Sequence, residues 1–231
     1  MATGFTPERI ERALAAYRAF WRGQTSRPLV SIYHQPTYRQ AFDDEKVIAG
    51  AVECIRADAA SGAEAILPTF WPDFGTISTA KMWGGRVIPP EGERCIHIAP
   101  VAQGPDDLAR LRPGAFEESD FQKAADLYRR VCDRLETDQV FIRTPDVQGP
   151  MNTLALLMDQ TELMCALYEA PDAIGAMLDR ITDVLIETVR RFIELIGPGK
   201  VIGNIWPFVC LPAEMGLCIT QDYLPLLSAE H

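Results

Sequence analysis

The sequence is poor in lysine and histidine and has no long uncharged hydrophobic run. Only 4 of its 22 basic residues are Lys and 18 are Arg; with 32 acidic residues, the net charge is −10. A basic stripe that follows a phosphate backbone is therefore missing, which argues against a nucleic-acid partner. No segment approaches the ~18 uncharged apolar residues of a membrane helix, and the N-terminus lacks a signal-peptide core. We expect a cytoplasmic protein without a membrane partner.

Metal and disulfide signatures are also missing. The six cysteines, at positions 54, 95, 132, 165, 210 and 218, include no CxxC pair. Cys54, Cys132 and Cys165 fall on apolar faces of helical patterns, where a free Cys packs as a small hydrophobe. Cys95 and His97 share one face of a strand, but zinc takes three or four protein ligands. We expect reduced thiols, no metal site, and no cofactor bound by this segment alone.

The composition is that of an ordinary folded domain. Of the 231 residues, 48% are hydrophobic and 23% are charged, both close to the average of soluble domains. No repeat, low-complexity tract or Ser/Gly linker divides the chain, so we expect one domain over residues 1–231. That length lies at the low edge for an α/β barrel, which typically needs ~250 residues.

Helical periodicity alternates with short β-rich runs. Helices are expected over residues 6–23, 44–61, 106–111, 119–135, from about 151, and 171–196, and strands over 29–33, 65–68, 139–144 and 200–205. A hairpin-like excursion is expected within 83–101. Because helical stretches separate the strands, we expect parallel pairing through helical crossovers. No Gly-rich nucleotide-binding turn follows the first strand, which favours a barrel over a doubly wound sheet.

In a barrel, the loops that follow the strands form the active site. The residues of interest in those loops are His34, Tyr38, Arg39, Trp71, Asp73, Asp146, Gln148, Asn152, Asn204 and Trp206. We predict that Asp146, His34 and Asp73 are catalytic and that the other seven bind a small-molecule substrate. The loops are expected to converge on one mouth.

Each of these assignments has a structural alternative. Asp146 stands between Pro145 and the Gly149–Pro150 pair, a stiff turn that fixes a carboxylate, but an Asp near a helix start also serves as a cap. Trp71 and Trp206, each followed by Pro, form walls for an apolar ligand or else cap the core. Both alternatives stay open on the sequence alone.

Three motifs resemble the uroporphyrinogen decarboxylase superfamily, and its divergent decarboxylase-like branch above all. They are T-P-D-V-Q-G-P at 144–150, Y-E-A-P-D-A at 168–173 and L-S-A-E at 227–230. The resemblance implies a TIM-type (β/α)8 barrel. Only about four of its eight strands are found here, so we expect the N-terminal half to two-thirds of the barrel and a chain that is incomplete at its C-terminus.

The resemblance implies two chemistries. One is cofactor-free decarboxylation of acetate side chains on a tetrapyrrole. The other is methyl transfer between a corrinoid and a thiol, with zinc, a corrinoid protein as partner, and zinc ligands that lie beyond His231. A homodimer is also implied. A non-catalytic barrel that binds a ring-shaped ligand is the alternative from another class.

The sequence departs from decarboxylases proper at three positions. Their R-Q-A-G-R-Y after the first strand is replaced by H-Q-P-T-Y-R at 34–39, which keeps one Arg near the place of two. Asp73 is an inexact substitute for the acidic residue of their F-S-D turn, and their tyrosine falls on Leu156. These departures argue against decarboxylation of uroporphyrinogen in its usual form.

Overall fold

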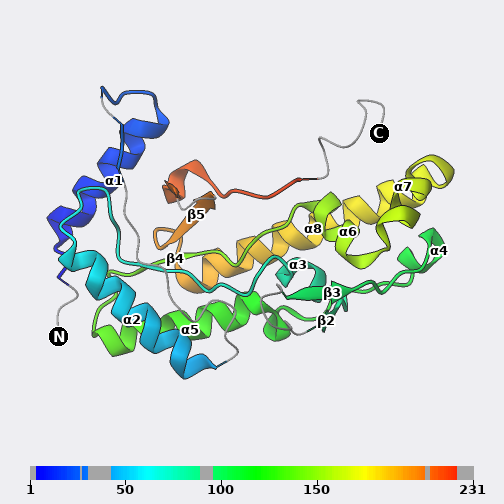
Figure 1. Cartoon of the computed structure of the whole chain (residues 1–231), viewed down its shortest axis with the longest axis horizontal. Coiled ribbons are helices and arrows are strands. Elements are labelled where there is room, and N and C mark those ends of the chain that lie inside the picture. Colours follow the sequence, from blue (N-terminus) through cyan, green and yellow to red (C-terminus); the bar gives the residue numbers. More distant parts are fainter. Residues whose placement is uncertain (1–3, 27, 31–42, 89–95, 206–208, 223–231) are drawn as a thin grey trace. The chain divides into compact units, whose positions relative to one another are not determined.

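The computed structural model describes residues 4–26, 28–30, 43–88, 96–205 and 209–222 (Figure 1). The chain divides into two compact units that are interleaved along the sequence. The first unit comprises Met1–Asp73, Ala124–Thr144 and Ile193–Cys218, and the second comprises Phe74–Lys123, Pro145–Phe192 and Ile219–His231. Neither unit is a continuous stretch of sequence.

A four-stranded sheet lies in the first unit. Its order is β1 (Thr69–Phe70), β4 (Phe141–Arg143), β5 (Val201–Ile205) and β6 (Val209–Leu211). β1 pairs with β4 and β4 with β5 in parallel, and Ile142 stands opposite both Phe70 and Val201. The predicted α/β class with parallel pairing is confirmed for these three strands, and the complete barrel stays a prediction.

Two strand predictions need correction. The segment 65–68 forms no strand; β1 begins at Thr69, while Ala65, Ile66 and Leu67 are buried without regular structure. Pro68 has no N–H to donate. It is hydrogen-bonded to β4 only through its carbonyl, which accepts from the Phe141 N–H at 2.8 Å. Within the first predicted strand, Leu29 and Val30 have no regular structure, and 31–33 lie outside the described residues.

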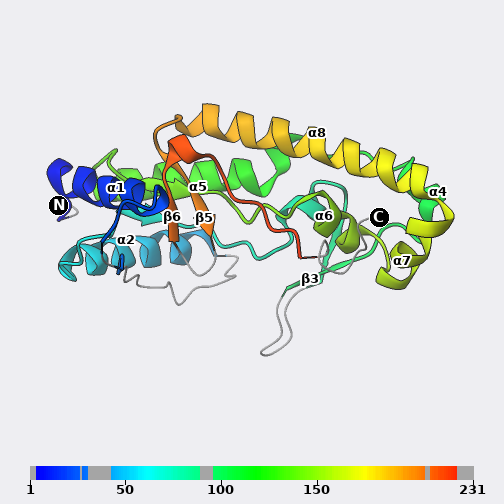
Figure 2. The same ribbon diagram turned by 90° about the horizontal axis from the view of Figure 1, so that it is seen from above.

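The fourth predicted strand is followed by a strand that the sequence analysis did not expect. β6 runs antiparallel to β5, with Gly203 opposite Leu211 and Ile205 opposite Val209. Figure 2 shows the two strands side by side. A Cβ on Gly203 would lie 2.9 Å from the Leu211 Cβ, closer than side chains pack. Glycine at this position therefore lets β6 approach β5.

Helices α1 (Pro7–Trp21), α2 (Asp44–Ala60) and most of α5 (Asp120–Leu135) complete the first unit with the short η2 (Ala213–Met215). The predicted starts are confirmed, since the Thr6 side chain accepts from Arg9 N and Asp43 accepts from the N–H groups of Glu45 and Lys46. Glu45 forms ion pairs with Arg130 and Arg134, which join α2 to α5 (Figure 1).

Two buried tyrosines and a tryptophan connect these helices to β6 and to the segments that lead into β1 and β4. Tyr17 Oη donates to Ala65 O at 2.9 Å, and Tyr128 Oη donates to Val140 O at 2.7 Å. Trp21 Nε1 donates to Cys210 O at 2.8 Å, which fixes α1 to β6. Each polar atom that these large side chains bury thus has a carbonyl partner.

The second unit consists mainly of helices. They are α3 (Ser78–Lys81), α4 (Pro105–Leu108), η1 (Phe116–Glu118), α6 (Pro150–Leu157), α7 (Gln160–Glu169) and α8 (Pro171–Ile196), the last in this unit up to Phe192. The predicted hairpin is confirmed, because β2 (Arg86–Ile88) and β3 (His97–Ala99) pair antiparallel. The helix predicted at 106–111 is shorter than expected and ends at Leu108, whereas the helix expected from about 151 begins at Pro150 and ends at Leu157.

Buried polar groups stabilise the second unit. The Asp120 carboxylate, 5% exposed, accepts from Ser78 Oγ at 2.9 Å and pairs with Lys81, joining the start of α5 to α3. Arg180 on α8 donates to the carbonyls of Leu108 and Leu111 and lies over the Trp83 ring at 5.3 Å. α8 is thereby fixed to the segment that follows α4.

Candidate functional site

The loop between β4 and α6 carries the central group of predicted site residues. Pro145 and Val147 are buried, Asp146 is half-buried, and Gly149 and Pro150 begin α6. Proline at the first helical position needs no N–H partner, so the helix begins at Pro150. The N-cap of α6 is Gly149 and no side chain caps this helix. Asp146 is therefore not the cap of α6.

A chain of side-chain amides extends from the Asp146 carboxylate. Gln148 Nε2 donates to Asp146 Oδ2 at 3.0 Å, and Asn152 Nδ2 donates to Gln148 Oε1 at 2.9 Å. The two amides are buried, at 5% and 4% exposure. A buried amide with its hydrogen bonds made is held in one orientation, so the orientation of the Asp146 carboxylate is fixed as well.

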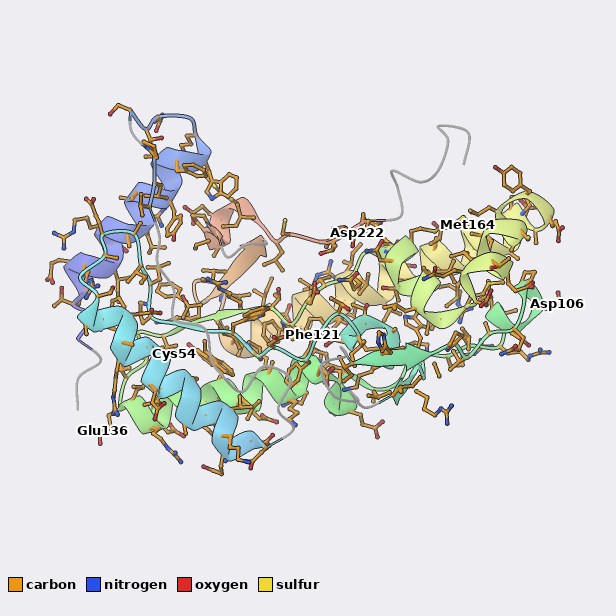
Figure 3. The ribbon with its side chains drawn as sticks, viewed as in Figure 1. Cys54, Asp106, Phe121, Glu136, Met164 and Asp222 are labelled. Carbon is orange, nitrogen blue, oxygen red and sulfur yellow. The ribbon has the colours of Figure 1, made fainter. Side chains whose placement is uncertain are left out.

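The same chain ends at a second carboxylate, which the sequence analysis missed. Asn152 Nδ2 also donates to Asp222 Oδ2 at 3.2 Å, and the Asn152 backbone N–H points to Gln221 Oε1 at 3.5 Å. Figure 3 shows Asp222 at the end of the described chain beside α6. The available signal was the polar T-Q-D run at 220–222, just before the L-S-A-E motif.

Backbone hydrogen bonds position this last segment. Thr220 N donates to Val147 O at 3.0 Å and Gly149 N donates to Thr220 O at 2.7 Å, which forms a parallel bridge with the β4–α6 loop. A Cβ on Gly149 would lie 2.6 Å from Gln221 Oε1. A larger residue at position 149 would therefore require the Gln221 side chain to move.

Two threonine hydroxyl groups hold the backbone of the β4–α6 loop in place. Thr153 Oγ1 lies 2.9 Å from Thr79 Oγ1 and donates to Gln148 O at 3.1 Å, and both threonines are buried. The backbone of Gln148 is thus held by α6 while its side chain binds Asp146. The arrangement offers two oriented carboxylates, which suit binding of a hydrogen-bond donor or transfer of a proton.

The other predicted site residues are placed only in part. Trp71 and Asp73 follow β1 in the first unit and are half-buried, whereas Asp146, Gln148 and Asn152 belong to the second unit. Asn204 stands in β5 opposite Cys210. His34, Tyr38, Arg39 and Trp206 lie outside the described residues. Convergence on one mouth therefore stays a prediction.

A buried arginine is a second residue that the sequence analysis missed. Arg143, the last residue of β4, is 3% exposed and is the only buried Lys or Arg among the described residues. Burial raises the pKa of Cys210 to about 12, and the positive charge of Arg143 acts in the opposite direction on that thiol. Arg143 thus brings a guanidinium close to β6, within the first unit.

A surface depression lies away from these strand ends. Its volume is about 650 Å³, and its lining comprises Tyr128, Arg129, Cys132, Asp133, Glu136, Thr137, Asp138, Ile196 and Lys200. These residues come from the end of α5 and the segments that lead into β4 and β5. The depression therefore faces the starts of the strands, whereas barrel chemistry takes place at their ends.

Within the described part of the chain, no three or more His, Cys, Asp or Glu side chains gather closely enough to hold a metal ion. His97 lies exposed on β3, and Cys95 is outside the described residues. The zinc of the methyl-transfer alternative has no fitting ligand set in these ranges. The described helices also include none that is long and apolar enough to cross a membrane.

Comparisons with known proteins agree with this architecture. Among solved structures, the chain is similar to a methyltransferase from Methanosarcina mazei, with a TM-score of 0.53 and 15% sequence identity. The match covers 81% of this chain and 56% of that protein, so the chain spans little more than half its length; at this identity the likeness shows the fold alone. Curated protein sequences give no match.

The family comparison covers the candidate loop. The sequence profile described as uroporphyrinogen decarboxylase (URO-D) matches residues 73–207, more than half of the chain. That range includes Asp146, Gln148 and Asn152, and it ends before Asp222. The chain belongs to the uroporphyrinogen decarboxylase (URO-D) family.

Proposed function

We propose that the chain is an enzyme of the carboxy-lyase type that acts on a tetrapyrrole or a related substrate. The observation that carries the proposal is the hydrogen-bonded chain Asp146–Gln148–Asn152 at the end of β4. It supplies an oriented carboxylate in the loop where barrel enzymes of this kind work. Family membership supports the reaction class, and the family's members are decarboxylases or methyltransferases.

In the proposed reaction, the bond between a side-chain methylene and its carboxylate breaks, carbon dioxide leaves, and a proton replaces it on the methylene carbon. The electron pair of the broken bond passes into a ring that has first taken up a proton; once a solvent proton has added to the methylene carbon, the ring releases the proton that it took up. The Asp146 carboxylate stabilises the positive charge on that ring, and Gln148 keeps the carboxylate aimed at it. No cofactor takes part in this sequence of steps.

The direct test is incubation of the full chain with uroporphyrinogen, with release of carbon dioxide as the readout. Release above a protein-free control supports the proposal. No release, under conditions where an authentic decarboxylase turns over, rejects uroporphyrinogen as the substrate.

Methyl transfer is the second candidate, since a protein with this fold is a methyltransferase. A zinc ion would supply thiol activation in that chemistry. The measurement is loss of the methyl–cobalt absorbance of methylcobalamin in the presence of a thiol and zinc. A rate that rises with protein concentration supports this candidate, and a rate equal to the protein-free control rejects it.

A further inference from the structure

The outer edge of β6, which is the edge that faces away from β5, lies at the end of the four-stranded sheet. The strand order is β1–β4–β5–β6, and no further strand among the described residues pairs with this edge. A terminal strand carries backbone N–H and C=O groups onto which a strand of another molecule can add. What those groups contact therefore determines whether the sheet can extend from one molecule to the next.

The pairing register shows which groups of β6 face outward. Gly203 stands opposite Leu211. In an antiparallel ladder, hydrogen-bonded pairs alternate with pairs that are not bonded to each other. If Gly203 and Leu211 were a non-bonded pair, the ladder would require the N–H of residue 212, which is Pro212 and has none. Gly203 and Leu211 are therefore bonded to each other, and the N–H and C=O of the next residue, Cys210, point away from β5.

Trp21 and Pro212 close this outer edge. Trp21, the last residue of α1, donates from Nε1 to Cys210 O at 2.8 Å, and Cys210 is fully buried. The next outward position along the chain belongs to Pro212, which offers no N–H. A strand that approached the edge would thus find one acceptor already in use and one donor missing.

Other contacts of the first unit hold α1 beside β6 independently of the indole. Tyr17 Oη donates to Ala65 O at 2.9 Å, and Arg18 forms an ion pair with Glu214 of η2, the element that follows β6. Removal of the N–H group of Trp21 should therefore leave the helix in place. The carbonyl on the outer edge of β6 would then lack its donor.

We propose that α1 protects the sheet edge: the Trp21 indole and Pro212 prevent β6 from pairing with the β6 of a second copy of the chain. A second copy is the expected partner because it carries the same strand. Antiparallel pairing about Cys210 would join the two identical edges by a two-fold axis, with each Cys210 N–H donating to the Cys210 C=O of the other copy. The inference is independent of the proposed function.

The variant Trp21→Phe tests the proposal, because it keeps an aromatic ring at the end of α1 and removes the donor. Sedimentation velocity of the full chain over a range of protein concentrations measures association. We expect an additional species of twice the parent mass, with a dissociation constant roughly ten-fold or more below that of any such step in the parent chain. A folded Trp21→Phe protein that sediments as the parent chain does overturns the proposal.

Tyr17→Phe is the matched control. It removes another hydrogen bond from α1 to a backbone carbonyl, that of Ala65, which lies outside the strands. We expect this variant to melt at a lower temperature and to associate only as the parent chain does. Equal association of the two variants would mean that any loosening of α1 causes it, and would refute a specific role of Trp21.

Pro212→Ala opens the same edge without a change in α1, and it decides the question if Trp21→Phe does not fold. The substitution restores an outward N–H, so we expect the same additional species, at a higher protein concentration than Trp21→Phe requires. Amide hydrogen exchange locates the contact: exchange in residues 209–212 should slow as the species forms. Absence of the species, or its formation without slower exchange in this segment, overturns the proposal.

Discussion

The Gln148 side chain determines how Asp146 presents its carboxylate. Its Nε2 donates to Asp146, its Oε1 accepts from Asn152, and its backbone carbonyl accepts from Thr153 Oγ1. A side chain with partners on all these groups has little freedom to rotate. Asp146 is thereby oriented by residues of its own loop and of α6, before any ligand arrives.

At Asp146, the substitution Asp146→Asn separates catalysis from stability. The Asn side chain keeps an oxygen that accepts from Gln148 but loses the negative charge. We expect the variant to lose whatever activity the parent chain shows, while its melting temperature stays within a few degrees. Turnover and a thermal melt measure the two quantities. Normal turnover with a large fall in melting temperature would show a purely structural role.

Glu136 holds a backbone conformation that usually belongs to glycine. Its φ is 54°, and it is the only described residue other than glycine with a positive φ. It follows the last residue of α5, where Thr137 N donates to Cys132 O at 3.1 Å and closes the helix. A left-handed non-glycine residue costs about 1 kcal/mol.

The substitution Glu136→Gly should therefore raise the free energy of unfolding by about 1 kcal/mol, as measured by urea titration. The matched control is Glu53→Gly, an exposed position within α2, where glycine should lower that free energy by about the same amount. If both substitutions lower it, the conformation of Glu136 carries no strain.

At the scale of the elements, the start of α2 illustrates how one cap depends on pH. The N–H groups of Lys46 and Glu45 donate to the Asp43 carboxylate and lower its pKa. A carboxylate whose pKa is lower in the folded chain stabilises the fold above the unfolded pKa of about 4. That contribution is lost as the pH falls through the lower, folded pKa.

We therefore expect Asp43→Ala to melt at a lower temperature than the parent chain at pH 7. The difference should shrink as the pH falls below about 4, because the parent carboxylate then becomes protonated. Thermal melts of both proteins across this range measure it. A difference that stays constant down to pH 2, or that grows on acidification, would contradict the capping role.

Elements with local signals were predictable, and elements with remote partners were not. α1, α2 and α8 could be predicted because each has a cap or a proline at its start and a regular apolar stripe. β1 begins after Pro68, because its pairing with Phe141 decides where the strand starts. β6 and residues 219–222 depend on Gly203 and on the Val147–Gly149 backbone, which no local pattern reveals.

The same distinction applies to the candidate site, where residues with a local signal were predicted and residues without one were missed. Asp146, Gln148 and Asn152 were predicted from one stiff turn and prove to be hydrogen-bonded to one another. Asp222 was missed because 70 residues separate it from Asn152. Arg143 was missed because a charged residue inside a strand gives no sign that it will be buried.

At the scale of the whole molecule, each unit is assembled from three separate segments. The family profile begins at residue 73, yet the first unit takes α1, α2 and β1 from the residues before it. Those elements provide the neighbour of β4 and the ion pairs of α5 through Glu45. The first unit therefore depends on sequence outside the matched region.

A fragment of residues 74–231 should consequently lose the packing of the first unit. We expect it to bind the dye 1-anilinonaphthalene-8-sulfonate, because the buried faces of β4 and α5 become exposed, and to show a broad thermal transition. Dye fluorescence and circular dichroism measure this against the full chain. A fragment that melts as sharply as the full chain, at the same temperature and without dye binding, would contradict this expectation.

The antiparallel β6 has a consequence for how the sheet can grow. Its residues 209–211 already use the edge of β5 at Gly203–Ile205, and glycine at 203 lets them sit close. A further parallel strand could pair with β5 along its whole length only by exchanging places with β6. If the sheet were extended at this edge, two strands would therefore compete for the same backbone N–H and C=O groups of β5. Substitution of Gly203 by a larger residue would weaken the pairing of β6 with β5 and would thereby favour pairing of β5 with the further strand.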